Sequence, residues 1–153
     1  MAENNATVSR NKKAFHDYFV VESFEAGIEL YGTEIKSIRK GNVNLKDSWC
    51  SIDGGELFAN GIHVSPYEQG NIFNRDPMRV RRLLMHKREI MRLFGLSKTV
   101  GYSLIPLSVY FKGSRVKVQV GLCKGKKLYD KRADMAARDA HRDIQRALKE
   151  KNR

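Results

Sequence analysis

Residues 103–122 read Ser-Leu-Ile-Pro-Leu-Ser-Val-Tyr-Phe-Lys-Gly-Ser-Arg-Val-Lys-Val-Gln-Val-Gly-Leu, the most regular stretch of the sequence. Apolar residues alternate along residues 103–111 and again along 115–122, the period of a strand that buries one face. The Lys-Gly-Ser tripeptide between these two runs is a turn signal. This stretch therefore predicts an antiparallel hairpin. Pro106 cannot donate a backbone hydrogen bond, so it predicts an edge position or a bulge.

A basic segment, Gly121 to Arg132, follows directly and contains five cations. Gly125 lies among lysines, and its conformational freedom predicts a bend where the strand ends. A Gly-containing Lys cluster suits phosphate oxygens, because the backbone can approach closely and each ammonium is a compact charge. Such runs are also common on solvated surfaces, so this one indicates phosphate binding only together with the rest of the chain.

The upstream sequence predicts further strands at residues 15–23, 28–38, 49–52 and 57–64, rich in aromatic and β-branched residues. Phe24–Gly27 is interpreted as a turn, and Gly32 as a bulge. Asp53-Gly-Gly-Glu56 is a strong hairpin signal. Asp76-Pro77 predicts a helix start, with Asp as N-cap and Pro in the first turn. This helix is expected to run to Gly95 with a break near His86.

The charge balance points to a polyanionic partner. The 153 residues include 29 Lys and Arg against 17 Asp and Glu, for a net charge of +12, which favours nucleic acid over an anionic membrane. There is no apolar run of about 20 residues and no apolar core of a signal peptide at the N-terminus. Cys50 and Cys123 lack zinc-ligand spacing. These observations predict a cytoplasmic protein without a metal or cofactor.

Together these signals predict a mainly β (α+β) fold. The expected architecture is a small antiparallel β-barrel of the oligonucleotide-binding type, with a helical insertion and a basic C-terminal tail. The predicted boundaries are a flexible arm at 1–10, an RNA-binding barrel at 11–129 and the tail at 130–153. The tail is expected to become helical against an anionic surface. The alternative is an ordinary solvated helix.

Catalysis has little support in the sequence. The four histidines, at 16, 63, 86 and 141, are scattered, with no nucleophile motif beside them. There is also no phosphate-binding loop of the Gly-x-x-x-x-Gly-Lys type. We therefore expect a binding protein and not an enzyme, recognising structured RNA by shape and backbone.

Several motifs, in order, resemble the SmpB family of SsrA-binding proteins. The resemblance covers roughly residues 9 to 135. It implies an oligonucleotide-binding-type barrel that binds transfer-messenger RNA and delivers it to stalled bacterial ribosomes. The segments that carry it are Asn11–Ala14, Phe24–Ile28, Gly32–Ser37, Asp76-Pro77 with Arg79, Arg82–Leu84, and Lys124–Arg132.

The resemblance also implies functional residues. Glu25 and Leu84 match RNA-binding positions of the family, although Leu84 has the alternative of being a core residue. His16 matches a contact with small-subunit ribosomal RNA. Tyr129 stands where some relatives carry His, so no proton-transfer role is carried over. The implied RNA-binding set is Asn11, Lys12, Lys13, Glu25, Lys36, Leu84, Lys124, Lys126 and Lys127. The implied ribosome-binding set is His16, Tyr129, Asp130, Lys131 and Arg132. Arg138, Arg142 and Arg146 are added because their spacing of four residues would place them on one side of a tail helix.

The expected partners are the tRNA-like domain of transfer-messenger RNA and the ribosome at its decoding centre and messenger channel. Elongation factor Tu on the same RNA is a further implied partner. One alternative is a general translation factor barrel that binds tRNA or ribosomal RNA. The other is a hydrolase acting on RNA or on peptidyl-tRNA.

Overall fold

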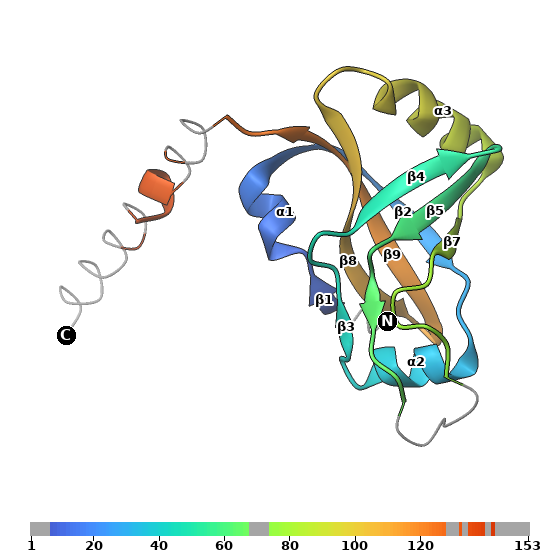
Figure 1. The fold of residues 1–153 in the computed structure, drawn as a ribbon. Helices are drawn as coiled ribbons and strands as arrows, with labels where there is room; N and C mark the ends of the chain where they lie inside the picture. The colour runs from blue at the N-terminus through green and yellow to red at the C-terminus, as the bar shows by residue number, and fades with distance from the viewer. Residues whose placement is uncertain (1–6, 68–73, 128–131, 133–134, 140–141, 143–153) are drawn as a thin grey trace, which may run out of the picture.

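The computed structural model describes residues 7–67, 74–127, 132, 135–139 and 142. Within them the fold is a sheet-dominated α+β domain with antiparallel pairing (Figure 1). The helices are α1 (Lys12–Asp17), α2 (Gly32–Arg39) and α3 (Lys87–Ser97). The strands are β1 (Thr7–Arg10), β2 (Tyr18–Ile28), β3 (Val43–Asn44), β4 (Trp49–Asp53), β5 (Glu56–Asn60), β6 (His63–Val64), β7 (Arg81–Leu84), β8 (Tyr102–Lys112) and β9 (Arg115–Gly125).

The main sheet has the strand order β1-β8-β9-β2-β7-β5-β4, and β3 pairs separately with β6. Within the described residues, strand pairing does not join β4 back to β1, so the sheet is not closed by hydrogen bonds. Its curvature nevertheless brings β4 against β8.

The predicted hairpin over residues 103–122 is confirmed by the pairing of β8 with β9. The bulge predicted at Pro106 is also confirmed, because the register shifts between Pro106 and Ser108. The bulge changes which face of the sheet the apolar side chains of β8 point to. Ile105 and Leu107 pack with Ala14 and Cys123 in a small second core, whereas Val109 packs in the main core. The apolar alternation along β8 therefore serves two faces and not one.

Gly121 is required where this second core meets the sheet. A Cβ at Gly121 would lie 2.5 Å from Leu107 Cδ1, inside the contact limit. We expect Gly121→Ala to destabilise the fold by about 1–3 kcal/mol, because a packed core cannot admit an extra methyl without displacement. Urea unfolding measures the change. Gly125→Ala, on the same strand with its nearest atom at 4.0 Å, is the matched control and should stay within about 0.5 kcal/mol. Equal losses would show that crowding against Leu107 is not the cause.

Three predictions about the first half of the domain are wrong. Lys12–Asp17 is helical, so the strand predicted from Phe15 begins only at Tyr18. Phe24–Gly27 is not a turn, because β2 runs through it and pairs with β9. Gly32 opens helix α2 within the segment predicted as strand 28–38.

Helix α2 owes its position to a buried ion-pair cluster around Glu34. The Glu34 carboxylate accepts hydrogen bonds from Arg79 Nη2 at 2.6 Å and Arg81 Nε at 2.8 Å. It also accepts from the Tyr31 backbone N–H at 2.9 Å, at the start of the helix. Arg81 is fully buried and donates to the carbonyl of Ile62 at 2.8 Å. Burial by itself would raise the pKa of Glu34, but these hydrogen bonds outweigh burial and hold its pKa below the ordinary value.

The helix predicted from Asp76 to Gly95 is also wrong in its first half. Arg81–Leu84 form β7 between β2 and β5, with alternating buried and exposed residues. Only Lys87–Ser97 is helical, so the expected break near His86 is the N-terminal limit of α3.

The ends of the domain differ from expectation as well. Thr7–Arg10, placed in a loose arm by the sequence, pair with β8 as β1. Gly125 ends β9 without a positive φ, so the strand end does not use the conformational freedom of glycine on which the predicted bend relied. The hairpin predicted at Asp53–Glu56 is confirmed, with Gly54 and Gly55 at φ 58° and 78°.

Candidate RNA interface

The structure gathers two basic segments that are far apart in the sequence at one end of the sheet. The end of β9 runs beside the start of β2, where Phe19 pairs with Lys124 and Tyr18 with Gly125. The backbone N–H of Lys126 donates to the carbonyl of Asp17 at 2.9 Å, which ties β9 to α1. We call this the basic end; its residues are Lys12, Lys13, His16, Lys124, Lys126 and Lys127.

Part of the basic end lines an open hollow of about 570 Å³. Arg10, Lys12, Phe15, His16 and Lys126 line it from the domain, and Arg138 lines it from the tail. Lys126 Nζ donates to the carbonyl of Phe15 at 3.3 Å and lies 5.0 Å above the Phe19 ring. His16 Nδ1 is 2.9 Å from Asp17 Oδ1 and its side chain is 44% exposed. Cations beside exposed rings can hold a phosphate and stack on a nucleotide.

Asn11 is buried and cannot itself contact RNA in this structure. It is 4% exposed, and its Oδ1 caps α1 by accepting from the Ala14 N–H at 3.1 Å. Its Nδ2 donates to the carbonyls of Pro106 at 3.0 Å and Leu45 at 3.2 Å. Asn11 therefore positions α1, and with it the lysines that follow.

We expect Asn11→Ala to lower the free energy of unfolding by about 2–3 kcal/mol, because the helix loses its cap and two buried carbonyls lose a donor. Any loss of RNA affinity should follow from the displacement of α1. Thermal unfolding and RNA titration measure the two effects. Lys12→Ala is the control, since Lys12 is exposed; it should leave stability within about 0.5 kcal/mol and weaken RNA binding. An Asn11→Ala protein of full stability with lost RNA affinity would point to direct contact instead.

A second group lies on the outer face of the main sheet, around Glu25. Glu25 pairs across β2 and β9 with Gln119, and Gly27 pairs with Lys117 on one side and Leu84 on the other. Directly opposed residues present their side chains on the same face of a sheet. We call this the sheet face; its residues are Glu25, Leu84, Tyr110, Lys112, Lys117 and Gln119.

Glu25 is fixed on this face as a carboxylate. Tyr110 Oη donates to its Oε2 at 2.5 Å, and Lys112 Nζ lies 3.4 Å from its Oε1. The hydrogen bond from Tyr110 lowers the pKa of Glu25; burial opposes this change, and Lys112 and Lys117 add to it. Burial and the Glu25 charge raise the pKa of Tyr110, so its hydroxyl stays a donor. An oriented carboxylate can accept from an RNA 2′-hydroxyl or a base amino group.

Leu84 is an exposed residue and not part of the core. Its exposure is 45%, and its Cβ would lie 3.3 Å from a Cβ built on Gly27. The core alternative for Leu84 is therefore wrong. Because Gly27 has no side chain, the exposed Leu84 opposite it presents an apolar surface beside Glu25. We call this surface the Leu84 step; a ribose or a base edge can pack against it.

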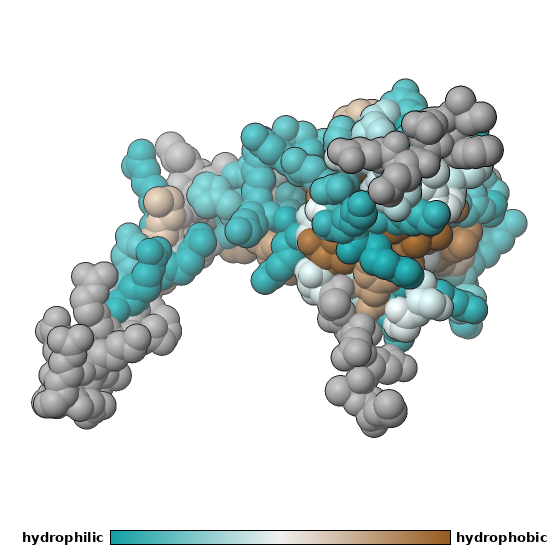
Figure 2. Space-filling model, turned by 90° about the horizontal axis from the view of Figure 1, so that it is seen from below, coloured by the Kyte–Doolittle hydropathy of each residue, from teal (hydrophilic) through white to brown (hydrophobic). Residues whose placement is uncertain are grey.

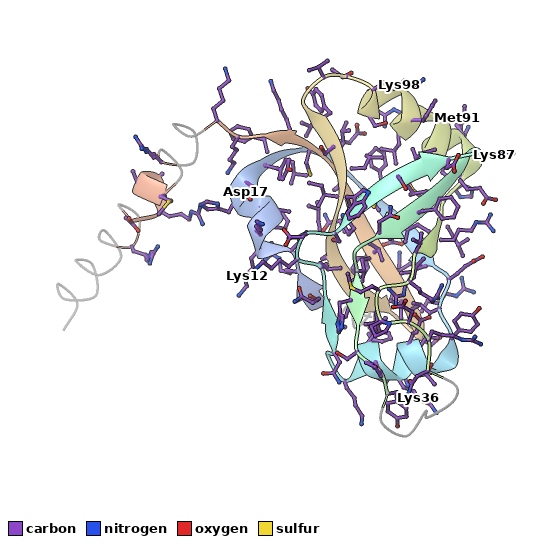
Figure 3. The ribbon with its side chains drawn as sticks, viewed as in Figure 1. Lys12, Asp17, Lys36, Lys87, Met91 and Lys98 are labelled. Atoms are coloured by element: carbon purple, nitrogen blue, oxygen red, sulfur yellow. The ribbon has the colours of Figure 1, made fainter. Side chains whose placement is uncertain are left out.

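The remaining predicted residues lie elsewhere. Lys36 is on α2, where its ammonium lies 5.5 Å from the Tyr67 ring, apart from the basic end (Figure 3). Arg132, Arg138 and Arg142 belong to the described part of the tail, which is helical and exposed. Arg142 pairs with Asp139 at 3.1 Å. Tyr129, Asp130, Lys131 and Arg146 lie outside the described residues.

The sequence analysis missed Tyr110, Lys112, Lys117 and Gln119 as members of the site. A signal for them existed, because Lys117 and Gln119 occupy the polar positions of the alternating strand. Figure 2 shows hydrophilic residues over much of the surface seen from below, with a smaller hydrophobic band between them. In the described part of the chain, no helix is long and apolar enough to cross a membrane, and no group of metal-ligand residues forms a cluster.

Comparison with known proteins matches this chain to one family. The family model described as "SmpB protein" matches residues 8–150. The SsrA-binding protein of Clostridium novyi (strain NT) is 60% identical over 151 residues, covering 99% of this chain and 96% of that protein. That of Carboxydothermus hydrogenoformans is 58% identical over 142 residues, covering 93% and 95%.

A solved structure described as "tmRNA-SmpB: a journey to the center of the bacterial ribosome" is similar in fold. It matches with a TM-score of 0.68 and 44% identity, covering 78% of this chain and 85% of that one. Since the family model spans most of the chain and the relatives match nearly end to end, the chain belongs to the SmpB family.

Proposed function

We propose that this chain is an adaptor that binds transfer-messenger RNA and carries it to stalled ribosomes for trans-translation. The observation that carries the proposal is family membership over nearly the whole chain, from residue 8 to 150. The proposal includes a cytoplasmic location, where ribosomes work. It assigns the chain no catalytic step of its own.

In this proposal the domain from residue 11 to 129 works as an oligonucleotide-binding-type barrel. The basic end takes the phosphates of the tRNA-like fold, since Lys12, Lys124 and Lys127 are exposed there. The sheet face adds selectivity through the oriented Glu25 carboxylate and the Leu84 step. Successive residues in a strand advance about 3.3 Å, so Glu25 lies roughly 23 Å along β2 from Tyr18. An RNA that contacts both groups must span a distance of this order.

The tail from residue 130 to 153 is proposed to bind the ribosome. His16 of the domain and Arg138 of the tail line the same hollow. This places a ribosome-binding residue of the domain next to the tail that is proposed to bind the ribosome. Arg138 and Arg142 are four residues apart and lie on one side of a helix. Against ribosomal RNA of the decoding centre and messenger channel, such a helix offers a row of guanidinium groups to phosphates.

A gel shift with transfer-messenger RNA at near-physiological salt, in the presence of excess ordinary tRNA, tests the proposal. Binding that survives the competitor supports it. Equal displacement by ordinary tRNA would leave a general tRNA-binding or ribosomal-RNA-binding barrel. Cleavage of ester-linked peptidyl-tRNA by the purified protein would indicate the hydrolase instead.

The salt dependence of binding should identify the basic end. Each phosphate neutralised contributes about 0.7–0.9 to the slope of log affinity against log salt. We expect the Lys12→Ala, Lys124→Ala double variant to lower this slope by roughly 1.4–1.8. Titrations at several salt concentrations measure it. Lys87→Ala is the control, because Lys87 lies on α3 away from α1 (Figure 3). A slope unchanged in the double variant would exclude these lysines as phosphate ligands.

A further inference from the structure

Trp49 stands out on the surface beside the basic end. It is 53% exposed, opens β4 and is the one tryptophan of the sequence. An aromatic ring that is half exposed to water lacks much of the hydrophobic stabilisation that it would gain in the core. Exposed aromatic residues next to cations are typical of surfaces that bind unpaired bases.

The Trp49 side chain borders two hollows along the seam where β4 meets β8. One, of about 290 Å³, is lined by Lys13, Asp17, Asp47 and Ser103 as well as Trp49. We call it the Trp49 hollow. The other, of about 380 Å³, is lined by Phe94 and Tyr102 as well as Trp49. Helix α1 contributes to both hollows, because Lys13 and Asp17 line the Trp49 hollow and Lys12 and His16 line the hollow at the basic end. Figure 3 labels Lys12 and Asp17 on this helix.

The backbone around Trp49 holds its ring in place. Gly61 has φ +77°, and a Cβ there would lie 3.2 Å from Trp49 Cζ3 and 3.2 Å from the carbonyl oxygen of Asp47. The ring edge is therefore packed on the Gly61 backbone. Before β4, Ser48 Oγ donates to the carbonyl of Leu45 at 2.5 Å and fixes the turn. A ring supported in this way is preorganised, so a stacking partner need not order it.

The charges around the Trp49 hollow favour a base over a phosphate inside it. Asp17 and Asp47 both line it, and two carboxylates repel a phosphate. Lys13 Nζ contacts Asp47 Oδ1 at 2.7 Å, and its side chain is 53% exposed. A lysine in that position can meet a backbone phosphate, while a carboxylate oxygen accepts from a base amino group.

We propose that Trp49, Lys13 and Asp47 form a stacking site for one unpaired, amino-bearing base of the bound RNA. This inference rests on the proposed function. The base lies against the Trp49 ring, Lys13 neutralises the adjoining phosphate, and Asp47 accepts from the exocyclic amino group. Adenine, cytosine and guanine carry such a group and uracil does not, so the site disfavours uracil.

The emission of Trp49 tests the proposal directly, because no other tryptophan contributes. Titration of the full chain with transfer-messenger RNA is expected to quench this emission and to shield the ring from acrylamide. Trp49→Ala should weaken RNA binding in a gel shift by about 5- to 100-fold, while Trp49→Phe should restore most of it. Met91→Ala is the matched control, since Met91 is also 53% exposed but lies on α3 (Figure 3); it should bind like the unaltered chain.

The outcomes separate this inference from the proposed function. RNA that shifts the protein in a gel but leaves Trp49 emission and acrylamide access unchanged would overturn the stacking site alone. Absence of any RNA binding would overturn both. Short adenosine and uridine oligonucleotides test the role of Asp47. Stronger quenching by adenosine that Asp47→Ala removes supports that role, because alanine leaves no acceptor, and equal quenching by both overturns it.

Discussion

Arg81→Met should lower the free energy of unfolding by about 3–5 kcal/mol, because the buried Glu34 carboxylate loses one of its two arginine partners and two buried carbonyls lose their donor. Arg81 is fully buried and donates to Glu34 at 2.8 Å and to the carbonyls of Ile62 and Pro77 at 2.8 and 3.1 Å. The methionine fills similar space but satisfies none of these acceptors. Urea unfolding monitored by circular dichroism measures the loss.

The neighbouring arginine provides a matched control. Arg82 is 43% exposed and pairs with Glu29 at 3.4 Å and with Glu56 at 3.1 Å. Exposed pairs contribute about 0–1 kcal/mol, so Arg82→Met should cost no more than that. If the two variants lost equal stability, the Glu34 cluster would not be what holds α2 and β7 together.

The same cluster predicts acid sensitivity. The folded-state pKa of Glu34 is held below its ordinary value, so folding favours the ionised form. Its contribution is complete above the unfolded-state pKa of about 4.3 and is lost as pH falls through the folded-state pKa. Unfolding free energies measured downward from about pH 5 should therefore fall less steeply in Glu34→Gln than in the unaltered chain. Parallel pH profiles would contradict this assignment.

The Glu34 cluster also explains where the sequence misled. Local propensity favours a strand at residues 28–38, but Glu34 binds arginines 45 and 47 residues away, a contact that no local pattern reveals. The same is true of β7, where Arg81 takes one of the two buried positions and Leu84 one of the two exposed ones. Because sequence reasoning places apolar residues in the core, it predicted a helix for Arg81–Leu84.

The sequence signals for tight turns and for the alternation of apolar residues correctly predicted the hairpins. The hairpins at Gly54-Gly55 and Gly113, each at positive φ, and the Pro106 bulge follow from rules that involve only neighbouring residues. The lysines of the basic end were proposed as an interface on a similar basis, since charge is visible in the sequence. Asn11 was assigned to the interface although it is buried, because its three partners come from Ala14, Leu45 and Pro106. Sequence identifies a polar residue, but only the fold shows which way it faces.

Removal of residues 131–153 should abolish the tagging of stalled peptides while leaving affinity for transfer-messenger RNA within about tenfold of the intact chain. Among the described residues, every buried apolar side chain lies between Ala14 and Cys123, so the truncation takes none of that core. The basic end and the sheet face also remain. A gel shift and a reconstituted tagging reaction on ribosomes stalled at the end of a message measure the two activities.

Point variants in the tail distinguish lost contacts from lost length. Arg138→Ala with Arg142→Ala keeps the chain length and removes two guanidinium groups from one side of the tail helix, so tagging should fall partway toward that of the truncated protein. Lys98→Ala, which removes a cation from the end of α3 (Figure 3), should leave tagging unchanged. A truncated protein that lost RNA affinity more than about 100-fold would contradict the division of labour, because RNA binding would then depend on the tail. Full tagging by the truncated protein would show that the domain alone engages the ribosome. The cations of the domain would then be sufficient for ribosome binding without a tail in the messenger channel.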